Sequence, residues 1–262
     1  MPELPDVEAF RQYLYSTSLH STVAHVEARD DLVLEDISQE DLRETLVGTE
    51  LADTARHGKW LLAQTAYGPW LCFHFGMTGE LAYFGEATDI PEHTRVLFVF
   101  ENGMHLAYLC QRRLGRITLT ESVEELVRRK ELGPDARDIS WECFSEVFSG
   151  RTAPVKPLLM DQKVIAGLGN ILVDEILFRS RLHPERSVHT LGEEQRRDLH
   201  DTLGRIVAVL IRARTQGDEV PDNWLLHYRS EGEQCPRCGA QLKRMSINSR
   251  ATYLCPRCQS QR

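Results

Sequence analysis

The sequence contains no apolar run near the roughly 20 residues that a helix needs to cross a membrane. Its first ten residues, MPELPDVEAF, have neither the basic flank nor the apolar centre of a secretory signal peptide. Internal repeats and low-complexity tracts are absent as well. Because 42% of the 262 residues are hydrophobic, we expect a globular cytoplasmic protein with one large domain or two smaller ones.

Cysteine is too scarce outside one motif to build a disulfide framework. Of the seven cysteines, four fall in a C-terminal metal-binding pattern, and the others are Cys72, Cys110 and Cys143. An odd remainder of this kind is typical of a protein from a reducing compartment.

Positive charge is also in short supply, because 31 lysines and arginines face 39 acidic residues, for a net charge of -8. This deficit speaks against a nucleic-acid partner, but the charge is unevenly spread. Residues 235–262 contain six basic and no acidic side chains, whereas residues 1–150 contain 13 basic and 26 acidic ones. The basic tail is where a polyanion would bind, although a solvated tail without a ligand has the same composition.

The N-terminal half combines a short helix with β-strands. Val7, Phe10 and Leu14 recur at helical spacing behind Pro5, a residue suited to a helix start. From about residue 21 the pattern is typical of strands, and Glu101-Asn102-Gly103 predicts a hairpin because Asn-Gly accepts positive φ. We therefore expect an antiparallel sandwich or barrel with strands in STVAHVEAR, KWLLAQTA, WLCFHF, VLFVF and MHLAYL.

The second half is predicted to be helical. Ser140 is a suitable N-cap for a helix through Phe148, and Thr190 with Glu193 forms a capping box before a longer helix. Gly217 is expected to end that helix, and the polar residues 218–234 to link it to the cysteines. The apolar positions of the longer helix are Leu199, Leu203, Ile206, Val207 and Leu210.

Two CxxC motifs, separated by sixteen residues, form the most specific pattern in the tail. Four thiolates at this spacing match one tetrahedral structural zinc ion. A redox dithiol is the alternative, but no βαβ pattern surrounds either pair. Four protein ligands leave no open position for catalysis, so the zinc would organise a hairpin that carries Lys243, Arg244 and Arg250. The four predicted ligands are Cys235, Cys238, Cys255 and Cys258.

A second motif, Ala166-Gly167-Leu168-Gly169-Asn170, precedes an apolar helical pattern. Its glycines permit a tight turn with exposed backbone amides, and Asn170 is placed to cap the next helix, whose N-terminus attracts anions. The motif is therefore a candidate phosphate-binding turn. A plain turn between two helices is the simpler interpretation.

The start of the chain carries a candidate nucleophile. Once Met1 is removed, Pro2 offers a secondary amine, and α-amino groups ordinarily have a pKa of roughly 7.7–8.0, so part of the amine is unprotonated near neutral pH. Attack of this amine on a sugar C1′ gives an iminium ion, which acidifies the C2′ hydrogen and lets the phosphates leave by elimination. Glu3 would transfer the protons. Most N-terminal prolines have no such role.

Taken together, MPELPDVE, HGKWLL, HFGMTGEL, KPLLMDQKVIAGLGNILVDEILF and the CxxC pair resemble the formamidopyrimidine-DNA glycosylase and endonuclease VIII family. The opening resembles the formamidopyrimidine branch. The resemblance implies an α+β protein: an N-terminal helix plus antiparallel β-sandwich in residues 1–130, a helix-two-turn-helix DNA-binding domain in residues 131–230 and a zinc-binding β-hairpin in residues 231–262. It also implies a bifunctional DNA glycosylase and lyase of base excision repair, with one structural zinc ion.

The resemblance assigns a role to several residues of this sequence. Pro2 is the Schiff-base nucleophile, Glu3 the general acid/base that opens the sugar, and Lys59 a cation on the phosphates near the lesion. Without the family, Lys59 would be an ordinary charged residue in a strand.

The remaining assignments concern contacts with DNA. Lys156 matches a lysine near the lesion, and Asn170 and Arg250 match residues that hold phosphates. An extruded base leaves a hole that side chains fill, and Met77, Arg112 and Leu114 stand at the positions of those wedge residues. For Met77, packing in the protein core is the alternative.

The sequence departs from the family pattern in ways that bear on the substrate. Cys110-Gln111 stands where the branch usually has Asp-Pro, and Leu114 replaces an aromatic wedge residue, which removes a stacking ring. Asp6 replaces the usual glutamate and keeps its charge. Residues 218–234 form a shorter segment than in the oxidised-guanine enzymes, where extra residues form a loop that caps 8-oxoguanine. We therefore expect lesions that need no cap, such as formamidopyrimidines, hydantoins or oxidised pyrimidines.

Three other functions stay open at this point. They are an oxidised-pyrimidine glycosylase of endonuclease VIII type, a catalytically silent damaged-DNA-binding protein, and a zinc-ribbon interaction module, which would explain only the tail. The presence of Pro2, Glu3 and Lys59 together favours an enzyme, since a binding protein needs no nucleophile. The expected partner is double-stranded DNA with oxidised bases or abasic sites, bound by a nucleoid-associated monomer.

Overall fold

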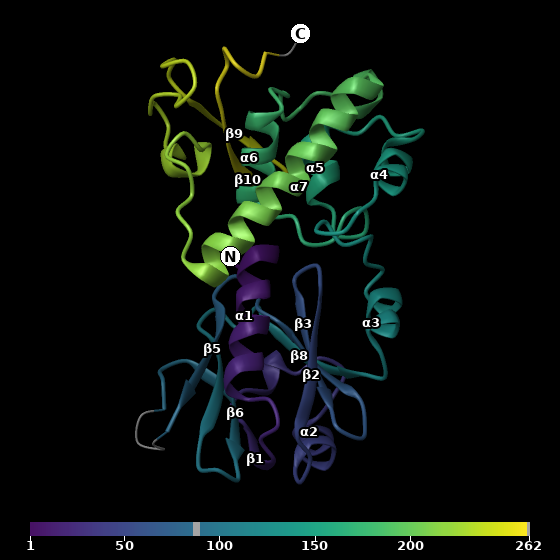
Figure 1. Cartoon of the computed structure of the whole chain (residues 1–262), viewed down its shortest axis with the longest axis vertical. Helices are drawn as coiled ribbons and strands as arrows, with labels where there is room; N and C mark the ends of the chain where they lie inside the picture. The colour runs from purple at the N-terminus through teal and green to yellow at the C-terminus, as the bar shows by residue number, and fades with distance from the viewer. Residues whose placement is uncertain (86–89, 261–262) are drawn as a thin grey trace. The chain divides into compact units, whose positions relative to one another are not determined.

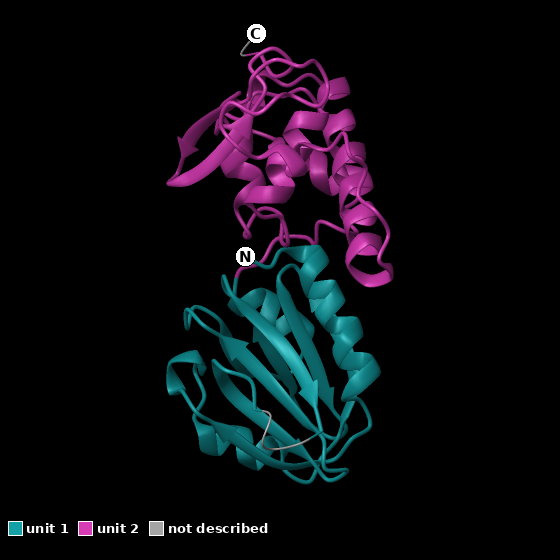
Figure 2. Ribbon diagram, turned by 90° about the vertical axis from the view of Figure 1, so that its left-hand side faces the viewer, with its two compact units in different colours: residues 1–130 teal, residues 131–262 magenta. Residues whose placement is uncertain are grey.

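The computed structural model describes residues 1–85 and 90–260, and the chain divides into two compact units, residues 1–130 and 131–262 (Figures 1 and 2). Each unit has a hydrophobic cluster of its own. Among the described residues, no helix has the length and apolar character needed to span a bilayer.

Unit 1 is built on two four-stranded antiparallel sheets. An isolated bridge between Thr22 and Glu50 joins the β1 edge of one sheet to the β2 edge of the other, but no continuous ladder of the described residues closes the two sheets, so the arrangement is a sandwich and not a barrel. The first sheet has the order β1 (Val23–Ala28), β6 (Thr94–Phe100), β7 (His105–Cys110) and β5 (Gly79–Phe84). The second has the order β2 (Leu51–His57), β3 (Trp60–Thr65), β4 (Trp70–His74) and β8 (Arg116–Thr120).

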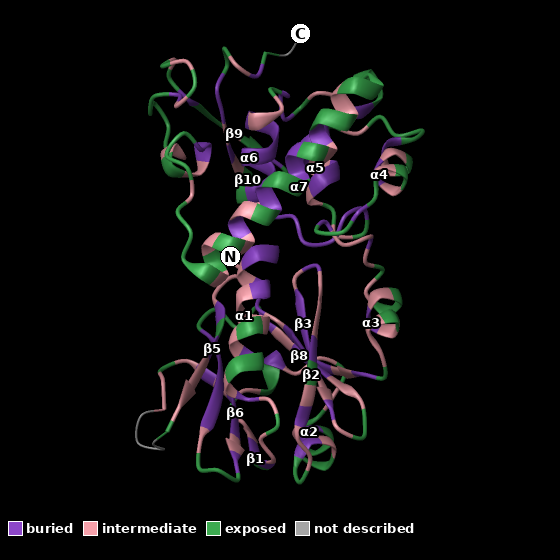
Figure 3. Ribbon diagram, viewed as in Figure 1, coloured by how far each residue is buried: buried purple, intermediate pink, exposed green. Residues whose placement is uncertain are grey.

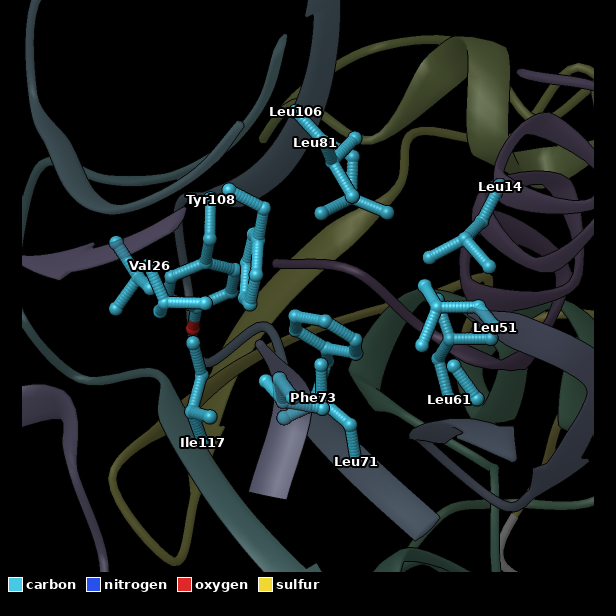
Figure 4. Packing of buried hydrophobic residues seen from close by; sticks show 14 of the residues in the cluster. Leu14, Val26, Leu51, Leu61, Leu71, Phe73, Leu81, Leu106, Tyr108 and Ile117 are labelled. Atoms are coloured by element: carbon cyan, nitrogen blue, oxygen red, sulfur yellow. The ribbon is translucent and has the colours of Figure 1, made fainter. Parts of the chain in front are cut away.

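The core of unit 1 lies between these sheets and takes side chains from both (Figure 4). Phe73 from β4 and Tyr108 from β7 meet there with ring centroids 5.9 Å apart. Strand β7 is buried along its whole length, because Ala107 and Leu109 on its other face pack with Leu97 of β6 in a smaller cluster. This explains why the segment MHLAYL lacks the alternation of a half-exposed strand. Figure 3 colours the chain by burial.

The predicted hairpin at Glu101-Asn102-Gly103 is confirmed. It joins β6 to β7, and Gly103 has a φ of 82°. Strands β2, β5 and β8 were not predicted, because polar residues interrupt their apolar alternation. Their register comes from the neighbouring strands, for example β2 from β3.

In the described part of unit 1 the α-helices are α1 (Leu4–Thr17), α2 (Gln39–Leu46) and α3 (Val123–Arg129). Helix α1 includes Pro5 in its first turn, as predicted, and packs against β2 and β3. Helix α2 was not predicted, although Ser38 and Asp41 form a capping box that marks its start.

Unit 2 is mostly helical, as expected, with α4 (Trp141–Phe148), α5 (Val155–Met160), α6 (Asn170–Arg179) and α7 (Glu193–Gln216). Ser140 caps α4, and Gly217 ends α7 with a φ of 75°. The predicted Thr190–Glu193 capping box is wrong, since Thr190 lies in a short 3₁₀ helix, Val188–Thr190. Gly192 is the N-cap of α7, and its amide donates to Gln195 at 3.3 Å.

The segment 218–234 links α7 to the cysteines, as expected, and most of its residues are exposed, but its middle part is packed against the protein. It contains a 3₁₀ helix, Leu225–Tyr228, and both Trp224 and Leu225 are buried. The chain then ends in an antiparallel hairpin, β9 (Lys243–Ile247) and β10 (Arg250–Leu254), between the two CxxC motifs.

Candidate active site and nucleic-acid interface

The start of α1 places an acidic side chain directly after Pro2. Glu3 is the N-cap residue and is only 4% exposed. Its backbone amide donates to the Asp6 carboxylate at 2.9 Å, and its carbonyl accepts the amides of Asp6 and Val7. Asp6 thus supports the helix start, and the exposed Met1 precedes the half-buried Pro2.

Lys59 lies in a two-residue turn between β2 and β3, and not inside a strand as expected. The last pair of the ladder is His57 with Trp60, so Gly58 and Lys59 form the turn. Gly58 has a φ of 56°, which a residue without a side chain adopts readily. In Figure 1 the amino terminus and the tip of this hairpin lie at the same end of unit 1.

An ion-pair network connects the two elements. The Glu8 carboxylate on α1 accepts Arg56 Nε at 3.1 Å and Arg11 Nη2 at 2.7 Å. Arg56 Nη1 also donates to the Gly58 carbonyl at 3.1 Å. The first turns of α1 are therefore tied to the turn that carries Lys59.

A half-buried imidazole, that of His74, lies near this turn. The ring of His74 is 5.0 Å from that of Trp60, and its Nδ1 accepts the Gly76 amide at 3.3 Å. Burial, followed by the positive charge of Lys59, lowers the pKa of His74 to about 4. The imidazole is therefore neutral at physiological pH and acts as an acceptor that shapes the turn leading to Met77.

The three wedge candidates come together from two loops of unit 1. A Cβ on Gly76 would lie 2.5 Å from the backbone of Leu114, so only glycine permits this approach. The Arg112 amide donates to Thr78 Oγ1 at 3.1 Å, which joins the two loops a second time. Leu114 is 45% exposed, Arg112 is exposed and Met77 is half-buried.

Cys110 takes a structural role at the base of the second loop. Its buried sulfur accepts the Gly115 amide at 3.3 Å, and its carbonyl accepts Arg95 Nε at 2.9 Å. These contacts close the loop 110–115 without the Asp-Pro pair that is usual in the formamidopyrimidine branch.

In unit 2, Lys156 lies in the interior and not on the surface. It is fully buried on α5, where its Nζ donates to Asp174 Oδ1 at 2.6 Å and to Thr252 Oγ1 at 2.7 Å. Asp174 Oδ2 accepts Arg229 Nη2 at 2.8 Å and the Tyr253 amide at 3.3 Å. The lysine thus joins α5 and α6 to strand β10.

The turn before α6 differs from the prediction in two respects. Gly169 is the N-cap of α6, so Asn170 is the first helical residue and not the cap. The Gly167 amide is not exposed, because it donates to Gln162 Oε1 at 3.0 Å in a buried turn. Asn170 instead uses one hydrogen of its side-chain amide for the Ala251 carbonyl, at 2.9 Å.

The basic side chains of the hairpin are exposed. Arg250 directly precedes Ala251 and Thr252, the two β10 residues that Asn170 and Lys156 hold. It also lines a groove of about 450 Å³ together with Arg151 and Asp161. Lys243 and Arg244 lie exposed on β9.

The four predicted metal ligands converge on one point. All four sulfur atoms lie within 4.8 Å of one another, and the Cys235–Cys258 and Cys238–Cys255 distances are 3.9 and 3.5 Å. A tetrahedral ion with Zn–S bonds of about 2.3 Å needs sulfur atoms roughly 3.8 Å apart. The site therefore fits one zinc ion, which with four thiolate ligands has a purely structural role.

The first zinc knuckle is also attached to α6. Arg237, between Cys235 and Cys238, donates to the carbonyls of Phe178 and Arg179 at 2.9 and 3.3 Å. These carbonyls lie at the C-terminus of α6, where a cation is favourable.

Several of these contacts escaped prediction from the sequence. Glu8 stands four residues after the buried Leu4, on the same helix face, and an acidic residue on an apolar face is a usable signal. No local pattern identifies Arg56, Asp174 or Arg237, because each acts through a residue distant in the sequence.

Comparison with known proteins covers almost the whole chain. Residues 1–117 match the formamidopyrimidine-DNA glycosylase N-terminal domain, residues 132–221 the formamidopyrimidine-DNA glycosylase H2TH domain, and residues 232–261 the zinc finger found in FPG and IleRS. The zinc finger match and the sulfur cluster confirm the predicted zinc.

Relatives of full length are also found. The formamidopyrimidine-DNA glycosylase of Pelotomaculum thermopropionicum is 34% identical over 273 residues, covering 99% of each chain. That of Latilactobacillus sakei is 32% identical and covers 100% of this chain and 99% of its own.

Among solved structures, wild-type Fpg (MutM) of Lactococcus lactis in complex with DNA containing N7-benzyl-Fapy-dG superposes with a TM-score of 0.88. It is 28% identical and covers 99% of this chain and 100% of its own. The similarity extends over both compact units and the zinc hairpin, which confirms the predicted α+β fold, and the chain belongs to the formamidopyrimidine-DNA glycosylase family.

Proposed function

We propose that this protein is a bifunctional DNA glycosylase and lyase of base excision repair. It excises an oxidised base and then cleaves the strand through a Schiff base at Pro2. The observation that carries this proposal is the N-terminus itself, where Pro2 directly precedes a buried glutamate at the helix start. The Glu8–Arg56 network then joins that helix to the turn of Lys59.

The chemistry follows from these groups. The Pro2 amine uses its lone pair to form a bond to C1′ of the sugar, and the bond between C1′ and the damaged base breaks, so that the base leaves with the bonding electrons and takes up a proton. The attached nitrogen then loses its own proton, and its lone pair forms a C=N bond as the C1′–O4′ bond opens. Glu3 donates a proton to the departing O4′, which leaves an iminium ion. Loss of the C2′ proton then expels the 3′ phosphate, and a second elimination expels the 5′ phosphate.

Lys59 adds a positive charge at the end of unit 1 where this reaction takes place. A lysine in a tight turn presents its ammonium group as a point charge to a phosphate. We assign it to the phosphates beside the lesion, where it neutralises charge while the sugar is attacked.

Unit 2 and the hairpin supply the hold on double-stranded DNA. Arg250 is exposed and residues 235–262 carry no acidic side chain, so we assign the phosphate contacts to this region, with the second amide hydrogen of Asn170 as a further donor. Lys156 supports the hairpin from the interior of unit 2 through its hydrogen bond to Thr252 on β10. We retain a division into a catalytic part, residues 1–130, a DNA-binding helical part, residues 131–230, and a zinc hairpin, residues 231–262.

Oxidised purines are the substrate class that the relatives favour. Their name specifies formamidopyrimidines, and similar MutM and Fpg structures hold DNA with carbocyclic 8-oxo-G or an AP site. Met77, Arg112 and Leu114 would fill the space that such an extruded base leaves. We infer a monomer that acts on nucleoid DNA.

Borohydride trapping on abasic-site DNA tests the proposal. The wild-type protein should become covalently attached to the strand, because hydride reduces the iminium ion to a stable amine, and the N-terminal peptide should carry the adduct. A chain with extra residues before Pro2 is the matched control. It keeps every side chain but turns the amine into a peptide nitrogen, so trapping should disappear.

A Pro2→Gly variant adds a second arm, and we expect a large loss of trapping efficiency. Unchanged trapping in both altered proteins would point to a lysine nucleophile and exclude Pro2. Binding of abasic DNA by the wild-type protein without any trapping would identify a silent damage-binding protein instead.

A further inference from the structure

Glu8 and Arg56 form a deeply buried ion pair in unit 1. Their side chains are 2% and 3% exposed. Arg56 uses different nitrogen atoms for two of its partners: Nε binds the Glu8 carboxylate and Nη1 binds the Gly58 carbonyl, each at 3.1 Å. That carbonyl belongs to the peptide group that joins Gly58 to Lys59, so Arg56 fixes the plane of the peptide that carries Lys59.

We propose that Glu8 and Arg56 are positioning residues, which hold the turn of Lys59 at a fixed place relative to the start of α1. The inference rests on the function proposed above, because it concerns the alignment of Pro2, Glu3 and Lys59. Glu8 lies five residues after Glu3 in one continuous helix, a rise of about 7.5 Å. Any displacement of Glu8 is therefore transmitted to the helix start.

The chemistry of the pair suits positioning better than stability. Burial by itself raises the pKa of the Glu8 carboxyl, but Arg11 and Arg56 outweigh this and hold the pKa below its ordinary value. Glu8 thus stays charged at neutral pH. A buried ion pair contributes little net stability compared with apolar residues of similar volume, whereas a guanidinium group holds two acceptors in a fixed geometry.

Arg11 provides a matched control on the same carboxylate. Its Nε and Nη2 bind Glu8 at 3.0 and 2.7 Å, and its Nη1 binds Thr54 Oγ1 at 3.2 Å. These three bonds join Arg11 to the Glu8 carboxylate and to β2, and none of them involves the turn of Lys59. Arg11→Met therefore removes one positive charge beside Glu8 while leaving the connection to the turn intact.

The experiment compares wild type, Glu8→Gln, Arg56→Met, Arg56→Lys and Arg11→Met. The rate of single-turnover borohydride trapping on abasic duplex DNA reports the reaction, and the dissociation constant for a duplex with a tetrahydrofuran site, which forms no Schiff base, reports binding. Circular dichroism and thermal unfolding confirm that each variant is folded.

We expect trapping in Glu8→Gln and Arg56→Met to slow by about 10- to 100-fold, because misplacement near 1 Å has effects of this size. Binding of the tetrahydrofuran duplex should change less than about threefold, since the hairpin of unit 2 is unaltered. Arg56→Lys should recover part of the rate, because a lysine reaches one of the two acceptors. Arg11→Met should stay within about threefold of wild type.

Other outcomes separate the two proposals. If wild-type protein fails to trap abasic DNA, the proposed function fails and the positioning role falls with it. If wild type traps and folded Glu8→Gln and Arg56→Met trap equally fast, only the positioning proposal is wrong. An equal loss in Arg11→Met would assign the effect to the charge on Glu8 and not to the turn. Should Arg56→Met not fold, Glu8→Gln, which keeps the side-chain volume, decides the question.

Discussion

Single side chains in unit 1 shape the backbone around the candidate catalytic residues. Asp6 binds the Glu3 amide, Arg56 binds the Gly58 carbonyl, and His74 accepts the Gly76 amide. Each contact joins a side chain to a backbone group within three residues of its own position. The candidate functional residues Glu3, Lys59 and Met77 therefore lie in backbone segments that polar side chains hold in place.

The half-buried His74 is expected to make the stability of the folded protein depend on pH. Its pKa is lowered from 6.5 to about 4, mainly by burial. Between these values the unfolded chain binds a proton that the folded protein does not, so stability falls as the pH drops from 6.5 towards 4. Because the ring keeps some contact with water, we expect a loss of about 2 kcal/mol, less than the full shift implies.

A His74→Asn variant tests this prediction, since the asparagine oxygen replaces Nδ1 as acceptor for Gly76 but does not titrate. Urea unfolding of both proteins between pH 4.5 and 7 should give a steeper pH dependence for the wild type. Parallel curves would show that His74 does not contribute.

Helix α6 contacts several other segments of unit 2. Its first residue, Asn170, holds β10, and Asp174 binds Lys156, Arg229 and the Tyr253 amide. Glu175 accepts the Leu226 amide at 2.9 Å, and the C-terminal carbonyls accept Arg237. One helix thus fixes the hairpin, the segment 218–234 and the first zinc knuckle.

The Lys156–Asp174 pair should behave as a structural unit of this helix. Lys156→Met leaves a buried carboxylate short of one partner, and removal of one member of a buried pair is strongly destabilising, by about 3 kcal/mol. Adding Asp174→Asn should recover part of the loss. Urea unfolding of the two single variants and the double variant gives the coupling energy. A stable Lys156→Met protein with about tenfold weaker DNA binding would instead place Lys156 at the DNA surface.

The zinc hairpin makes a separate prediction. We expect one zinc per chain by metal analysis, and Cys238→Ser should lose both the ion and most of the affinity for duplex DNA. The sandwich of unit 1 should keep its thermal transition, because its core shares no residue with the cysteine cluster. Equal DNA affinity in the variant would show that the hairpin is not part of the interface.

For the whole molecule, the distribution of charge matters more than its sum. The chain has a net charge of -8, yet residues 235–262 contain only basic charged residues. We expect affinity for duplex DNA to fall steeply with salt, because each phosphate contact adds roughly -0.9 to the slope of log K against log salt. Arg250→Ala should flatten the slope by about one unit. A wild-type slope near zero would contradict a phosphate-binding hairpin.

The choice of substrate depends on whether residues 218–234 cover the flipped base. Trp224 is 5% exposed beneath the Arg179 guanidinium, whose carbon lies 5.1 Å from the ring centroid, and Arg179 also holds Asn223 at 2.8 Å. Trp224 and the short helix Leu225–Tyr228 are thus packed against Arg179 and α6, so we do not expect Trp224 to act as an aromatic lid over a flipped base. We expect residues 218–234 to be too short to form the cap of the oxidised-guanine enzymes, and without that cap a flipped 8-oxoguanine would lose contacts worth about 1–3 kcal/mol each.

We therefore expect ring-opened purines or hydantoins to be excised faster than 8-oxoguanine opposite cytosine, while abasic sites are cleaved in full. Single-turnover rates on matched duplexes, each with one lesion, measure this order. The prediction fails if 8-oxoguanine opposite cytosine is excised as fast as every other lesion tested.

Much of this protein is determined by local sequence patterns. The two CxxC motifs predict the zinc site because four thiolates at that spacing suit a single ion, and Asn102-Gly103 predicts its hairpin because the turn needs positive φ. A helix with a clear cap, such as the one after Ser140, is predicted as well, because the capping residue and the helix are neighbours in the sequence. The order of motifs along the chain was enough to identify the family.

The tertiary structure decided what depends on contacts between distant residues. Lys156 was expected near the lesion but lies in the interior, because Asp174 and Thr252, far away in the sequence, neutralise and bind its ammonium group. The backbone amide of Gly167 was expected to be exposed, but it donates a hydrogen bond to the side chain of Gln162. The Glu8–Arg56 pair spans 48 residues, and no pattern within a single strand or helix specifies such a pair, because its energy arises only when the fold removes both charges from water.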